Sequence, residues 1–314
     1  MDKQNQLIKI ARLYYLEEMN QTDIAKKMNM SLASVSRSIN RAKEIGLVTI
    51  SVQDSRDKLE DMEIAIEKKF NLRECLLVPS SNSLDLIYSG MARQLGMLLD
   101  RVLAPKSIVG VSWGDTLRVM AESMPPVERP CQGVVPIIGA VGEIETGIFP
   151  NRIADAYSQK LRSHAYLVNT PGLVDSIETK KLVTADTSFS KIAAKWKKVS
   201  IILFSISSLR KATSISGGDI FTKDQWSEVE SAGASVTTNF NFLDKEGAEV
   251  KTKLSKRIVN LSYHEMKKKE HRVLASSGND KVQPILSALK SELPTVLITD
   301  LKTARSLINK QNKL

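Results

Sequence analysis

The chain of 314 residues is too long for one small core and has the length of a two-domain protein. Its composition, 42% hydrophobic and 25% charged, is that of an ordinary soluble protein, and no apolar run is long enough to cross a membrane. The polar start, the two cysteines and the three scattered histidines argue against a secretory signal, a disulfide framework and a metal site. We therefore expect a cytoplasmic protein without a metal or another cofactor.

The formal net charge of +10 favours a polyanionic partner such as nucleic acid. The charge is not concentrated, however: residues 1–53 hold eight Lys and Arg against five Asp and Glu, and a basic run lies far away at 267–272. Charge alone does not locate a nucleic-acid site.

Three short helices are predicted at the start of the chain. Apolar residues recur at helical steps over 7–15, a short helix follows at about 22–28 with Asn20 or Thr22 as its cap, and Ser31 can cap a third helix over 32–45. Gly46 ends the third helix, and residues 47–52 read as a strand, which indicates a winged variant. The residues expected on the inner face of the third helix are Leu32, Val35, Ile39, Ala42 and Ile45.

The outer face of the third helix is short, polar and basic. Such a face fits the DNA major groove, and N–H groups and hydroxyls at helix starts suit phosphate oxygens. Arg37 suits either a guanine edge or a phosphate, and the alternative for the whole face is an ordinary solvated surface. The predicted DNA-binding residues are Thr22, Ser31, Ala33, Ser34, Ser36, Arg37, Asn40 and Arg41.

Residues 54–70 are predicted to form a linker helix after a DNA-binding domain at 1–53. Its apolar stripe from Leu59 through Ile66 to Phe70 is narrow. The stripe fits either pairing with a second helix or packing on the next domain, and the sequence leaves both open.

Residues 71–314 are predicted to form an α/β domain. Buried-type strands are expected within 75–80, 107–114, 133–142, 200–207 and 295–300, and amphipathic helices alternate with them. Continuous apolar strands that alternate with helices indicate a mostly parallel sheet, whose ligands bind beyond the carboxyl ends of the strands.

Three strand-to-helix turns are therefore candidate ligand sites and are expected to converge. The first, "VSWGDT" at 111–116, offers hydroxyls at Ser112 and Thr116, close backbone approach at Gly114, and Asp115 as a helix cap or a sugar-hydroxyl acceptor. The second lies at 139–143, and the third, at 278–281, contains Lys281, which suits a phosphate. A capped turn without ligand and a solvated lysine are the alternatives.

The chain resembles the SorC family of bacterial transcriptional regulators. The motif at 21–50 matches the family's helix-turn-helix, and later segments occur in family order, among them "GVSWGDT", "VVPIIG", "PNRIADAYS", "FLDKEG", "RIVNLSYHEMKK", "SSGNDKVQPILSALK" and "VLITDLKTAR". The resemblance implies operator DNA as a partner and a homo-oligomer, often a tetramer. It also implies a sensor domain, similar to sugar-phosphate isomerase-like folds, that binds a phosphorylated sugar or a related metabolite. The effector-binding residues that it implies are Ser112, Gly114, Asp115, Thr116, Gly139, Asn151 and Lys281.

Three segments depart from the family pattern. Gly139-Ala140 replaces a Gly-Gly pair, residues 236–238 replace Gly-Asp-Ile, and residues 205–207 replace Gly-Ile-Gly. The missing acidic residue predicts altered recognition of the sugar portion. The expected function is therefore a sugar-phosphate-controlled regulator of carbohydrate metabolism and not an enzyme, with two alternatives: a regulator blind to effector or controlled by a partner, and, more distantly, a sugar-phosphate enzyme.

Overall fold

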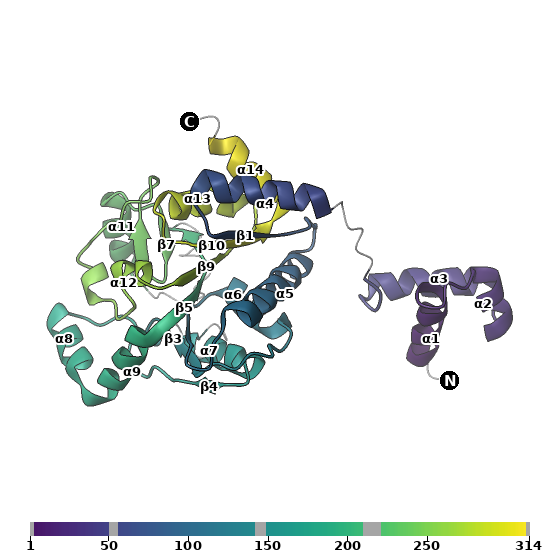
Figure 1. Ribbon diagram of the computed structural model, residues 1–314, viewed down its shortest axis with the longest axis horizontal. Coiled ribbons are helices and arrows are strands. Elements are labelled where there is room, and N and C mark those ends of the chain that lie inside the picture. The colour runs from purple at the N-terminus through teal and green to yellow at the C-terminus, as the bar shows by residue number, and fades with distance from the viewer. Residues whose placement is uncertain (1–2, 50–55, 142–148, 210–220, 312–314) are drawn as a thin grey trace. The chain divides into compact units, whose positions relative to one another are not determined.

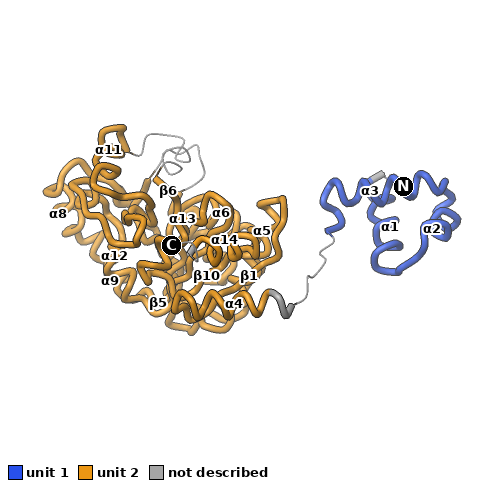
Figure 2. Tube along the Cα trace, turned by 90° about the horizontal axis from the view of Figure 1, so that it is seen from above, with its two compact units in different colours: residues 1–54 blue, residues 55–314 orange. Residues whose placement is uncertain are grey.

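A computed structural model describes residues 3–49, 56–141, 149–209 and 221–311. The chain divides into two compact units, residues 1–54 and residues 55–314 (Figure 2). Each unit has its own hydrophobic core, and each is described by itself.

The first unit contains three helices, α1 (Lys3–Tyr15), α2 (Gln21–Met28) and α3 (Leu32–Glu44). Their shared core is formed by Ile10, Leu13, Ile24, Val35 and Ile39. This core confirms the three predicted helices and most of the predicted inner face of α3, where Val35, Ile39 and Ala42 are buried.

Two predictions for this unit are wrong. Leu32 and Ile45 are 52% and 48% exposed, because they lie at the two ends of α3, beyond the reach of the other helices. The predicted strand is not formed over Leu47–Thr49, where the backbone bends after Gly46; the rest of that prediction, residues 50–52, falls outside the described residues.

A seven-stranded sheet organises the second unit, and all its pairs are parallel. Its order is β1-β10-β9-β5-β2-β3-β4. The bounds of these strands along the chain are β1 Glu74–Val78, β2 Ile108–Val111, β3 Gly133–Pro136, β4 His164–Ala165, β5 Val199–Phe204, β9 His271–Ala275 and β10 Val296–Asp300. The predicted α/β domain with a mostly parallel sheet is thus confirmed.

Helices cover both faces of this sheet (Figure 1). One face carries α5 (Leu84–Val102), α6 (Asp115–Ser123) and α7 (Pro150–Lys160). The other carries α4 (Arg56–Phe70), α9 (Thr187–Lys198), α13 (Val282–Lys290) and α14 (Leu301–Gln311). Strand side chains alternate between the two cores: Ile202 and Phe204 of β5 face the second set of helices, and Ile201 and Leu203 face the first.

The predicted linker helix, α4, belongs to the second unit. Ile66 and Phe70 are buried, and Leu59 and Met62 pack partly against the same core, beside β1 and α14. The apolar stripe is therefore used for packing on the α/β domain, the second of the two interpretations of the sequence.

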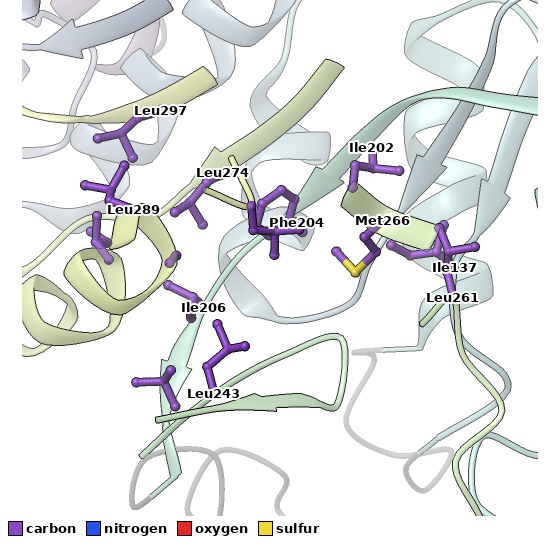
Figure 3. Close-up of a cluster of buried hydrophobic side chains, with 14 of the residues drawn as sticks. Ile137, Ile202, Phe204, Ile206, Leu243, Leu261, Met266, Leu274, Leu289 and Leu297 are labelled. Atoms are coloured by element: carbon purple, nitrogen blue, oxygen red, sulfur yellow. The ribbon is translucent and has the colours of Figure 1, made fainter. Parts of the chain in front are cut away.

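A smaller antiparallel sheet lies beside the large one, in the order β6-β7-β8. The core that joins the two sheets runs from Leu297 and Leu274 through Phe204 to Leu243 (Figure 3). The remaining elements are β6 Ser207–Ser208, β7 Val236–Thr238, β8 Asn241–Leu243, α8 Ile177–Ala185, α11 Lys223–Ser231 and α12 Tyr263–Lys267, with short 3-10 turns η2 Ser255–Arg257 and η3 Asn279–Lys281.

Candidate functional site

The first candidate site is the turn between α2 and α3. The Asn20 side chain caps α2 by accepting a hydrogen bond from the backbone N–H of Asp23 at 2.9 Å, which decides between the two predicted caps. Asn29 ends α2 in the left-handed conformation, at φ 51°, and Ser31 caps α3 by accepting from the N–H of Ser34. These three local interactions build a helix-turn-helix.

The predicted DNA-binding residues lie on α2, at the Ser31 cap and along α3. Ser34 and Ser36 are half-buried, and the others are exposed: Thr22, Ser31, Ala33, Arg37, Asn40 and Arg41. The Arg37 side chain folds back and its Nε donates to the carbonyl of Ala33 at 3.3 Å, whereas Arg41 pairs with Glu44 at 3.2 Å. Both pairs are solvent-exposed, so both guanidinium groups can exchange these contacts for phosphate or base contacts at little cost.

The second candidate site lies where the connections of the large sheet reverse direction. After β2 the chain proceeds outward to β3 and β4, whereas after β5 it proceeds to β9 on the other side. A crevice forms outside the carboxyl ends of two strands at such a switch point, which is where open α/β sheets bind ligands.

A cavity of about 530 Å³ occupies this position. That volume is within the range of small-molecule sites. Its wall combines the ends of β2 and β5 with α5, α6, the small sheet and η3. The lining residues are Leu84, Asp85, Tyr88, Trp113, Gly114, Asp115, Thr116, Arg118, Val119, Ser205, Ile206, Ser207, Thr237, Thr238, Asn239, Phe240 and Lys281.

Lys281 is a buried cation in this wall. The residue is 6% exposed, and its ammonium donates to the carbonyl of Ile206 at 2.9 Å and to the hydroxyl of Ser207 at 2.6 Å. A buried ammonium is costly unless it is hydrogen-bonded, and it attracts an anion strongly in a medium of low dielectric constant. The predicted alternative of a solvated surface lysine is therefore wrong.

A second cation, Arg118 on α6, is fixed at the same cavity. Its guanidinium donates to Asp115 and to Glu122, and the hydrogen bond to Asp115 raises the pKa of Arg118 above its ordinary value. Asp115 is the first residue of α6 and makes no side-chain cap, since Gly114 precedes the helix. Asp115 thus orients Arg118. The sequence motif at 111–116 did not reveal Arg118, although its spacing of three from Asp115 places both on one side of the helix.

Ser112 is buried behind the residues that line the cavity. It is 1% exposed and its hydroxyl donates to Oδ1 of Asn239 at 3.0 Å, while Nδ2 of Asn239 donates to the carbonyl of Ile137 at 3.0 Å. Asn239 lines the cavity and Ser112 does not. The predicted Ser112 hydroxyl therefore positions a lining residue that the sequence did not reveal.

Two other predicted effector residues also lie outside the described lining. A Cβ on Gly139 would stand 2.6 Å from the carbonyl oxygen of Thr170, so this glycine permits close packing of the 170–172 loop. Asn151 binds the backbone of Val168 twice, accepting from its N–H at 2.9 Å and donating to its carbonyl at 3.1 Å. Of the three predicted turns, the first and third meet at the cavity, and residues 139–141 of the second do not.

Two of the three departures from the family pattern lie at this cavity. Ser205, Ile206 and Ser207 follow β5, and Thr237 and Thr238 lie on β7; all five line the wall. Thr238 donates to the carbonyl of Ser205 at 2.9 Å and so joins the two segments. Hydroxyl groups thus stand where the resemblance implied an acidic residue. The aromatic rings of Tyr88, Trp113 and Phe240, which the sequence did not single out, line the same cavity.

No helix among the described residues is long and apolar enough to span a membrane. Over the same residues, no three His, Cys, Asp or Glu side chains gather in a way that could hold a metal ion.

Residues 56–309 match the family model described as "Putative sugar-binding domain". The chain belongs to this family. It is 25% identical over 305 residues to the sorbitol operon regulator of Klebsiella pneumoniae, with 96% of this chain and 97% of that one covered, and 26% identical over 312 residues to the deoxyribonucleoside regulator of Bacillus subtilis (strain 168), with 98% of each covered. The crystal structure of full-length SorC from Klebsiella pneumoniae superposes with a TM-score of 0.77 at 25% identity, over 98% of this chain and 99% of that one. These findings confirm the predicted resemblance to the SorC regulators.

Proposed function

We propose that the protein is a DNA-binding transcriptional regulator whose affinity for operator DNA is controlled by a phosphorylated sugar or a related anionic metabolite. The first unit contacts the operator through α3, and the cavity of the second unit holds the effector. An effector changes DNA binding only by the difference between its affinities for the two states of the protein.

The observation that carries this proposal is the buried ammonium of Lys281 at a switch-point cavity. Two of its hydrogen bonds go to neutral acceptors, a carbonyl and a hydroxyl, so a phosphate can exchange for either of them and gain a charge-assisted bond. Hydroxyl and amide groups of the same wall, at Ser207, Thr238 and Asn239, suit sugar hydroxyls, and the aromatic rings suit the apolar faces of a sugar.

Calorimetry with the full chain tests this assignment. We expect a pentose phosphate or a hexose phosphate to bind, inorganic phosphate to bind more weakly, and the corresponding free sugars to show no heat. A bound sugar phosphate should also change the affinity for a duplex selected by the protein from random DNA. Equal affinity for a sugar and its phosphate would contradict the role given to Lys281.

One observation favours a second candidate, a regulator that responds to no effector. The Ile206 carbonyl and the Ser207 hydroxyl already occupy the Lys281 ammonium, and both belong to a segment that departs from the family pattern. If no phosphorylated metabolite binds while selected DNA does, this candidate replaces the first.

We further propose that the protein acts in the cytoplasm as a homo-oligomer, a tetramer, and that it is not an enzyme. One helix-turn-helix buries little surface on DNA, and such units usually act in pairs on symmetric half-sites. Sedimentation of the full chain at micromolar concentration tests the assembly, and incubation with sugar phosphates tests for turnover; a monomer or a product would refute the corresponding statement.

A further inference from the structure

An apolar side chain stands exposed at the start of the predicted DNA-reading helix. Leu32 is the first residue of α3, and its helical spacing to Val35 and Ile39 predicts burial beside them. The structure leaves it 52% exposed, outside the core of Ile10, Leu13, Ile24, Val35 and Ile39. The Ser31 cap fixes where the helix begins, and it therefore fixes Leu32 as the first, exposed residue of α3.

The surroundings of Leu32 match the chemistry of a major-groove edge. Ala33 beside it is small and exposed, which permits close approach. The Arg37 side chain is held over the same helical turn by its bond to the Ala33 carbonyl. An exposed apolar side chain at the start of this helix suits the edge of a thymine, whose C5-methyl is the one apolar group that the bases present in the major groove. Arg37, one turn further along, suits a phosphate or a guanine.

We infer that Leu32 is a specificity-determining residue that packs against the C5-methyl of a thymine in each operator half-site, with Ala33 beside it. The inference rests on the proposed DNA-binding function and extends it: Arg37 and the helix caps supply affinity, and Leu32 distinguishes thymine from cytosine. Cytosine lacks the methyl group, so the discrimination requires no hydrogen bond from the side chain.

Replacement of thymine by deoxyuridine tests the inference, because it removes only the methyl group. Duplexes are first selected from a random pool by the full chain, and each thymine of the selected site is then replaced in turn. We expect one position in each half-site at which the replacement weakens wild-type binding about three- to tenfold at constant salt.

The Leu32→Ala variant should bind the thymine duplex with the same loss and should be indifferent to deoxyuridine at that position. Leu32→Met, which keeps an apolar side chain of similar volume, should retain the methyl dependence. Leu16→Ala is the matched control: it removes a 73% exposed leucine of the same unit, from the residue after α1, and should bind both duplexes as wild type does.

If no deoxyuridine replacement changes the affinity of the wild type, the inference is overturned, and no variant is needed to show it. Equal loss for Leu32→Ala on both duplexes overturns it too, and a simultaneous change in oligomeric mass would identify a second copy of this chain as the partner of Leu32. If the full chain enriches no duplex, the proposed function fails with the inference; enrichment without methyl dependence removes the inference alone.

Discussion

Two turns of the large sheet look alike in sequence and differ in what they do. The turn after β2 and the turn after β3 each follow a buried parallel strand and contain a glycine. Gly114 and Thr116 of the first line the cavity, whereas Gly139 of the second packs against the 170–172 loop.

The difference arises from the order of the strands. The end of β2 lies beside the end of β5, from which the chain departs in the opposite direction, so a crevice remains open between them. The end of β3 lies on one side of that point, and the backbone of residues 170–172 covers it: Ala140 donates to the carbonyl of Thr170 at 2.8 Å, and Gly172 donates to that of Ala140 at 2.7 Å. A strand end thus becomes a site where no other described segment closes it.

The largest effect is expected from Gly139→Ala, at the closed strand end after β3. Gly139→Ala places a methyl group 2.6 Å from the Thr170 oxygen and 2.7 Å from the Gly172 nitrogen, and both neighbours are backbone atoms. We expect a loss of about 3 kcal/mol in the free energy of unfolding, because overpacking against backbone cannot relax. Urea denaturation measures the loss. Sugar-phosphate affinity of the protein that stays folded should not change, and a selective loss of affinity would return Gly139 to the effector site.

Lys281→Met should give the opposite result at the open strand end. It keeps an unbranched chain of similar length and removes the ammonium, so phosphate binding should weaken by about 2 kcal/mol, roughly thirtyfold. DNA binding without effector should stay intact. Lys302→Met is the control, since Lys302 is an exposed lysine that follows β10 outside the cavity. Similar sugar-phosphate affinities of the two variants in calorimetry would contradict the site.

Local signals in the sequence predicted the helices of the first unit and the alternating strands and helices of the second. They did not predict the cavity residues that are brought together from distant segments. The caps Asn20 and Ser31 and the left-handed Asn29 act within four residues of their own position, so the local sequence reveals them. Asn239 reaches the cavity only because β7 lies beside the end of β5, across the Thr238–Ser205 bond, and no spacing rule encodes that contact. The predicted burial of Leu32 was wrong because helical periodicity assumes that the core extends along the whole length of the helix.

The strand end after β10 is also closed, and it contains a buried carboxylate, Asp300. Asp300 is 3% exposed and accepts from the hydroxyls of Ser277 and Thr303 and from the N–H of Lys302. Burial alone would raise the pKa of Asp300, but these hydrogen bonds together lower it below its ordinary value.

Asp300→Asn should therefore cost about 1.5 kcal/mol of stability at neutral pH and leave effector affinity unchanged. Since the folded-state pKa is depressed, the contribution of the carboxylate is fully present above about pH 4 and is lost as the pH falls through the lower folded-state value. The wild type and the variant should then converge in acid. Denaturation curves at pH 7 and pH 3 measure this, and a constant difference between them would refute it.

The smallest effect is expected at Ser112. This residue lies at an open strand end, but its side chain is buried like those at the closed ends. Ser112 follows β2 at the open end, yet its side chain is buried behind the wall and orients Asn239. Ser112→Ala removes that bond, which costs about 1 kcal/mol of stability. Asn239 keeps its bond to the Ile137 carbonyl, so it should remain in place with more freedom. In the proposed binding mode Asn239 faces the sugar portion and Lys281 the phosphate. We therefore expect sugar-phosphate affinity to fall by a factor of about two to five and affinity for inorganic phosphate to stay the same. Calorimetry with both ligands distinguishes the two, and an equal loss for each would show that Ser112 touches the anion directly.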